Sequence, residues 1–199
     1  DSTSTADSNL LGVGAAGIRV TSFTAATLLD SDTRAIIGEA AEVTAGSVSV
    51  TADATNTEKA DIDSAGISAL EITTLKAEAR DASFVEARIG PTGAGSASSR
   101  TRVTTTTGGI SVLANLTSVV EATPRFVSFS LFLGAGSNTV FATQEAQVRA
   151  EIGSWSDLLA QGGDITVDAG LVTRTLASAA GVGASFGVGV VLSEGTAED

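Results

Sequence analysis

The sequence predicts an all-β fold, and within that class a β-solenoid (β-helix-like) built of repeats of about 55 residues. Two recurring anchors predict it. The segment Gly-Ser-Val-Ser-Val-Thr-Ala at residues 46–52 returns in related form at 109–114 and 163–169. A second anchor, Ala-x-Ile-Gly, stands at residues 35–38, 87–90 and 150–153. Self-similarity at a fixed period is typical of arrays in which each unit buries its apolar face against its neighbours.

The stretch that follows each Gly-led anchor alternates with a period of two, which predicts a half-buried strand. In the first copy the apolar face carries Val48, Val50, Ala52, Ala54, Ala60 and Ile62, and the polar face begins with Ser49, Thr51 and Asp53. The same register recurs at residues 110–116 and 165–171. Because strands of this length are unusual, we expect a bend at residues 63–66. Pro124 lies at the matching position of the next repeat, where a corner tolerates proline.

Each repeat then returns through a second alternating segment, at residues 85–89 and 148–152. Gly38, Gly90 and Gly153 close these return segments, and we expect a turn with positive φ at each. The connections that follow, at residues 39–45, 91–108 and 154–162, differ in length. Variable length at one phase of a repeat predicts surface loops.

We therefore expect a single repetitive β domain over residues 1–199, with approximate units 1–45, 46–108, 109–162 and 163–199. Similar Gly-rich segments at residues 11–17 and 180–187 indicate that the chain begins and ends in mid-repeat. Neither end shows a polar cap, and uncapped ends expose strand edges that favour end-to-end assembly. The alternative fold is an antiparallel β-sandwich of long hairpins, because that fold also needs period-two strands and glycine turns.

The composition narrows the classes of function. The chain has no His and no Cys, which excludes disulfides, thiolate metal sites and a Ser-His-Asp triad within it. We expect that the protein is not an enzyme and has no catalytic or cofactor-binding residues, although a carboxylate pair suited to glycoside chemistry stays open. The net charge of −12 disfavours nucleic acid and anionic membrane surfaces as partners.

Three local patterns have both a structural and a functional interpretation. Residues 12–17 match the dinucleotide fingerprint, but strand-like residues follow where a helix is required, so we interpret them as a glycine turn. The apolar run at residues 177–192 is too short for a membrane-spanning helix, and we expect a buried strand. The candidates for weak Ca²⁺ binding follow no known Ca²⁺ loop, so the metal site stays unknown; they are Asp30, Asp32, Asp61, Asp63, Asp164 and Asp168.

The aromatic residues are few and invite predictions of their own. Trp155, the single Trp, lies in a variable connection, where it either plugs the edge of the core or contacts a neighbouring subunit. Phe126, Phe129, Phe132 and Phe141 are concentrated in one unit, and we expect them to thicken its core.

Residues 35–56 carry a family resemblance. Ala-x-Ile-Gly, a short turn, Val-x-Ala-Gly and then Val-Ser-Val-Thr-Ala-Asp-Ala-Thr-Asn resembles repeats of very large bacterial filamentous adhesins and haemagglutinin-like proteins, and weaker copies cover most of the chain. The resemblance implies an extracellular or cell-surface structural protein and supplies no catalytic residues. We expect a filament subunit, or a stalk segment of a large adhesin or matrix fibre, that joins further copies end to end. The alternative is a glycan- or calcium-binding adhesion module, with host or surface glycans as partners.

Overall fold

The structure, a computed structural model, describes residues 1–198 and is almost entirely β. Its one helical element among these residues is the 3₁₀ turn η1 (Ala97–Ser99). The strands are β1 (Ser2–Leu29), β2 (Asp32–Ile37), β3 (Glu42–Ala45), β4 (Val48–Asp81), β5 (Phe84–Ile89), β6 (Thr101–Thr105), β7 (Ile110–Gln144), β8 (Gln147–Ile152), β9 (Ser156–Ala160), β10 (Ile165–Ala177), β11 (Ala180–Ser185) and β12 (Val188–Glu198). The all-β prediction is confirmed.

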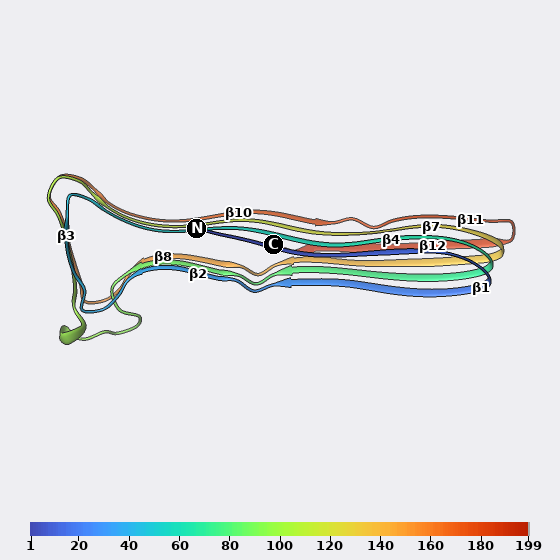
Figure 1. Cartoon of the computed structure of the whole chain (residues 1–199), viewed down its shortest axis with the longest axis horizontal. Coiled ribbons are helices and arrows are strands. Elements are labelled where there is room, and N and C mark those ends of the chain that lie inside the picture. The colour runs from blue at the N-terminus through green and yellow to red at the C-terminus, as the bar shows by residue number, and fades with distance from the viewer. Residues whose placement is uncertain (199) are drawn as a thin grey trace.

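The strands form three parallel sheets. The largest has the order β1-β4-β7-β10, with β11 and β12 also paired to β7; the smaller sheets have the orders β2-β5-β8 and β3-β6-β9. Figure 1 shows an elongated molecule in which the long strands run to a bend at the right-hand end, return, and meet the short strands at the left. Every strand pair in the described part of the chain is parallel, so the antiparallel pairing of a hairpin sandwich is not found.

The register of these sheets aligns the sequence anchors. Val48 pairs with Ile110, and Ile110 pairs with Ile165, so the three Gly-led segments lie side by side. Ala35, Ala87 and Ala150 also share one row. The spacing between partners is uneven: contacts between successive layers join residues 52 positions apart near the N-terminus and 62 apart in the middle. The repeats therefore stack in phase although their lengths differ.

The core lies between the outgoing leg of β4 (residues 48–68), its return leg (70–81), the corresponding legs of β7, and the short strands. One apolar cluster joins the two legs through residues such as Ile62, Leu75 and Val120. The second joins the start of β4 and β7 to β5 and β6 through residues such as Val85 and Val103. Small side chains, mainly Ala and Val, dominate both clusters, and they allow the facing strands to approach closely.

Three predicted details are wrong. Residues 63–66 pair with β7 in unbroken register, and the register shift that we assign to the bend lies at residues 68–70. Among the three closing glycines, only Gly90 has positive φ, at 99°. The variable connections also contain the short strands β3, β6 and β9, which stack in register and are not simply loops.

Pro124 pairs in register with Ile62, at the matching position that the sequence predicts, but both lie within continuous strands. The neighbouring strand is interrupted there. β10 ends at Ala177, opposite Ala122, and β11 begins at Ala180, opposite Arg125. The missing proline N–H therefore coincides with a gap in the ladder, which removes the usual cost of proline inside a sheet.

Candidate functional surfaces

A buried polar layer separates the two apolar clusters. Asp81 lies at its centre, on the return leg of β4, and is fully buried. Ser118 Oγ donates to Asp81 Oδ2 at 2.6 Å, Gln144 Nε2 donates to the same oxygen at 3.0 Å, and the backbone N–H of Ser83 donates to Oδ1 at 3.0 Å. Asn56 Nδ2 lies 2.8 Å from Ser83 Oγ. These contacts join both legs of β4 to β7.

Hydrogen bonds keep the central carboxylate ionised. Burial alone would raise the pKa of Asp81, but the hydrogen bonds from Ser118, Ser83 and Gln144 outweigh burial and hold that pKa below its ordinary value. Donors that point at a carboxylate favour its charged form. The layer therefore contains a stable buried negative charge.

Glu58 is the opposite case. Its side chain is fully buried, and neither carboxylate oxygen has a hydrogen-bond partner in the described chain. Its neighbours in the ladder are Ala6 and Val120, which offer no side-chain donor. Burial raises the pKa of Glu58 from its ordinary 4.5 to about 8, and the charge of Asp81 acts in the same direction. Glu58 is thus a mainly neutral acid at pH 7, and its isolation from solvent leaves it without access to a substrate.

The sequence contained a signal for this layer. Asn56 and Glu58 occupy the same even positions of the alternation as Ala54 and Ala60, so the period of two already directs them inward. The prediction of an apolar inner face considered only the apolar residues of that series. Asp81 and Gln144 share one row of the return legs, which only the register of the sheet reveals.

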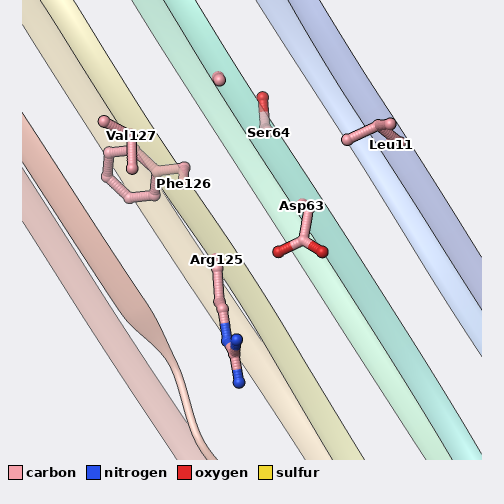
Figure 2. Close-up of a pocket in the computed structure, with 7 residues that line it drawn as sticks. Leu11, Asp63, Ser64, Arg125, Phe126 and Val127 are labelled. Carbon is pink, nitrogen blue, oxygen red and sulfur yellow. The ribbon is translucent and has the colours of Figure 1, made fainter.

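The outer surface carries a shallow hollow of about 260 Å³ near the bend. Figure 2 shows that three adjacent strands line it: Leu11 comes from β1, Asp63 from β4, and Arg125 and Val127 from β7. Ser64, Ala65 and Phe126 complete the lining. The lining is mostly apolar, with the two charged side chains in one row of the sheet. Such a hollow suits a single apolar side chain.

The structure does not bring the six candidate Ca²⁺ ligands together. Asp32 pairs with Arg34 at 2.6 Å, Asp61 accepts a hydrogen bond from Thr123, and Asp63 lies in the hollow. The others are exposed at separate places; they are Asp30, Asp164 and Asp168. Over residues 1–198, no three side chains of His, Cys, Asp or Glu are gathered so that they could hold a metal ion.

Glycines of the fingerprint-like segment have a different role from the predicted turn. Gly12 lies inside β1, and a Cβ built there would stand 2.3 Å from the ring of Phe23. No helix follows this segment, since β1 continues to Leu29. The same relation links Gly136 to the buried ring of Phe126, with a Cβ distance of 2.2 Å. Each of these glycines leaves room for an aromatic ring between the two legs of one long strand.

The aromatic predictions are largely wrong. Phe126 is buried, but Phe129, Phe132 and Phe141 are exposed on the outer surface. Trp155 does not plug the core either: it is 45% exposed, has φ of 58°, and lies under the guanidinium of Arg100, 5.6 Å from the ring centre.

The apolar run at residues 177–192 does form strands, the end of β10, β11 and the start of β12. These strands are not buried, because they lie at the open edge of the largest sheet; Val182, Val188 and Leu192 are each 60% exposed or more. No helix in the described chain is long and apolar enough to cross a membrane.

Comparison with known proteins found no match: no protein family, no curated protein and no solved structure is significantly similar to this chain.

Proposed function

We propose that this chain is a structural protein: a flattened β-solenoid that forms part of an extracellular fibre, as a filament subunit or a stalk segment of a large bacterial surface adhesin. Its role is mechanical. Backbone ladders hold the layers together along the fibre, small apolar side chains fill the interior, and the terminal layers join further layers. The resemblance of residues 35–56 to adhesin repeats supports the extracellular setting.

The observation that carries this proposal is the unfinished core at the C-terminal layer. Ile165, Val167 and Leu171 continue the inward rows of β10, yet they are 45%, 43% and 47% exposed. One layer earlier, their partners Ile110, Val112 and Leu116 are at most 1% exposed. Covering such side chains stabilises a protein by roughly 25 cal/mol per Å² of apolar surface. A further layer stacked on β10 would remove that exposure.

The geometry favours open-ended growth. In residues 1–198, β1 pairs only with β4, and β10, β11 and β12 pair only with β7, so the largest sheet has one free edge at each end of the stack. The two edges belong to parallel strands that run in the same direction. A second copy can therefore place its β1 beside the β10 edge and continue the same ladder. Such a head-to-tail contact does not close on itself and produces a filament.

Negative-stain electron microscopy at micromolar concentration tests the proposal. We expect long fibres, with the strands perpendicular to the fibre axis and a fibre-diffraction spacing of about 4.8 Å along it. Leu171→Lys places a charge in the unfinished core and should abolish the fibres. Val172→Lys is the matched control, since Val172 is the next residue of β10 and faces outward.

Two outcomes would contradict the proposal. One is a wild-type protein that stays monomeric at all concentrations and is as stable as the Leu171→Lys variant. The inward rows of β10 would then not be covered by a second copy. The other is fibre formation that Leu171→Lys and Val172→Lys reduce equally, because assembly would then not use the inward rows of β10.

A glycan-binding adhesion module is the second candidate, and the surface position of Trp155 favours it. The ring is half-exposed in a turn, and the guanidinium of Arg100 lies against it. An aromatic ring beside a hydrogen-bond donor is a suitable platform for a sugar. Because Trp155 is the single Trp, its fluorescence reports binding directly during titration with oligosaccharides. An unchanged spectrum at millimolar sugar, with wild type and Trp155→Ala indistinguishable on a glycan array, would reject this candidate.

A further inference from the structure

At the bend, which lies at the right-hand end of Figure 1, large apolar side chains face outward. We call its outward-facing side chains the tip band, which comprises the exposed residues within 11–20, 65–72, 127–135 and 182–192. Along the legs, most apolar residues point inward. In the tip band Val13, Ile67 and Val127 point outward and are more than half exposed, while Gly66 and Ser128 of the same strands are buried.

The tip band is also free of charge on its outer side. Within its four ranges the charged residues are Arg19 and Glu71, and both point inward. Arg19 Nη1 lies 2.9 Å from Glu71 Oε1, and the Glu71 side chain is 1% exposed. Thr73 and Ser68 donate to the same carboxylate. The chain has a net charge of −12, so the tip band is the part of its surface where another acidic copy can approach without direct repulsion.

We propose that the tip band binds the tip band of a second copy, so that fibres associate laterally in pairs. The two tips overlap along their length, and the acidic legs of the two copies extend away from the contact in opposite directions. The hollow lies at the base of the band, where its apolar side chains, such as Leu11 and Val127, adjoin the charged pair Asp63 and Arg125 (Figure 2). Phe132 and Phe186 lie near the bend at the other end of the band and are 72% and 82% exposed.

The dimensions agree with mutual insertion. About six residues separate the hollow from the bend, which corresponds to roughly 20 Å of strand. When two tips overlap over this whole length, the exposed rings at the end of one tip reach the hollow at the base of the other. The contact is reciprocal under a two-fold axis, so each copy supplies both the rings and the hollow.

One pair of tips has too small a contact area for a stable complex, so the contact needs stacked subunits. The inference therefore rests on the proposed function. Four strands 4.8 Å apart and 20 Å long present roughly 400 Å² per face. A stable complex buries about 800 Å² on each partner, so a single pair of tips falls short. In stacked subunits the tip bands form a continuous stripe, and each added subunit contributes the same area again.

A lipid leaflet is the other medium that could cover an apolar tip, and the strand edges of a single subunit argue against it. At the tip, β1 and β12 each leave one side of the backbone unpaired in the described chain. Open sheet edges are not tolerated in the hydrocarbon region, where no water satisfies them. When a second copy covers the tip, these edges stay in water or pair with the next subunit of the fibre.

The test is electron microscopy of wild type and of the double variant Phe132→Ser, Phe186→Ser. Both side chains are mostly exposed, so the fold should be retained, and Phe141→Ser is the matched control because Phe141 is exposed outside the tip band. We expect paired or bundled fibres for wild type and Phe141→Ser, and loss of pairing with intact single fibres for the double variant.

The other results are distinguishable. Single fibres of wild type, or paired fibres of the double variant, would overturn lateral association and leave the proposed function intact. An absence of fibres from every variant would reject the proposed function and this inference with it. Phosphatidylcholine vesicles are added in a parallel sample. Co-sedimentation of wild type with vesicles, lost in the double variant and accompanied by single fibres, would also overturn the inference and assign the tip band to lipid.

Discussion

Replacing Glu58 by Gln should change how the stability of the protein depends on pH. Glu58 is buried without a hydrogen-bond partner, and its pKa is raised from 4.5 to about 8 in the folded chain. Between these two values the folded state keeps a proton that the unfolded state has released. The free energy of unfolding therefore falls as pH rises through this window, by about 1.4 kcal/mol per pH unit for this one group.

The magnitude follows from the width of the window. A pKa that moves from 4.5 to about 8 corresponds to a loss of up to about 5 kcal/mol between pH 4.5 and pH 8. Gln has nearly the same shape and does not titrate, so the variant lacks this loss. We expect the Glu58→Gln variant to match wild type within about 1 kcal/mol near pH 4.5, and to be more stable by several kcal/mol at pH 8.

Urea denaturation followed by far-ultraviolet circular dichroism, repeated from pH 4.5 to pH 8.5, measures the difference. All other carboxylates are shared by the two proteins and cancel in the comparison. Glu39→Gln, at an exposed turn, is the control and should follow the wild-type curve. Parallel curves for wild type and Glu58→Gln over this range, or a wild type that gains on the variant as pH rises, would refute the reasoning.

Three further substitutions test the packing. Arg19→Ala leaves the buried carboxylate of Glu71 without its cation, and we expect a loss of about 3–5 kcal/mol in urea denaturation; a loss below 1 kcal/mol would show that the pair is solvated. Gly136→Ala places a Cβ against the buried ring of Phe126 and should cost about 1–3 kcal/mol in the same assay. Gly17→Ala meets no atom within 4 Å and should be neutral; equal effects of the two substitutions would contradict the close packing of the two legs of β7. Ile62→Ala should lower stability by about 2–5 kcal/mol, and retention of the wild-type midpoint would mean that the two legs of the long strands are not packed together.

The sequence predicts the strands well because alternation is a local property. Val50, Ala52 and Ala54 point inward as predicted, and the stacked anchors follow from their spacing along the chain. The position of the bend is not local in this sense. It depends on room for the inward pair of Arg19 and Glu71, which a Cβ at residue 66 would obstruct, and this contact joins two different layers.

The outward-facing apolar side chains at the tip contradict the simple expectation that apolar residues are buried. Ile67 and Val127 belong to the odd positions of their strands, the same series as the outward-facing Asp61 and Asp63. Their parity therefore places them outside, and strict alternation predicts their exposure better than hydrophobicity does. Phe129 belongs to the same series, so the prediction that it lies in the core is wrong for the same reason.

The buried polar layer solves a problem that this composition creates. In strands rich in Ala and Val, a slip of two residues keeps every apolar side chain inside, so hydrophobicity alone defines the register weakly. The layer removes that ambiguity, because Asp81 meets Gln144 in the next strand only in the observed register. A slip by two would place Asp81 opposite Ala142 or Ala146, which offer no side-chain donor. A buried ionised carboxylate that loses its side-chain donors costs several kcal/mol, which is comparable to the total stability of many domains. One row of polar contacts thus fixes the alignment of the long parallel strands, and in a stacked fibre the same alignment is needed at every added layer.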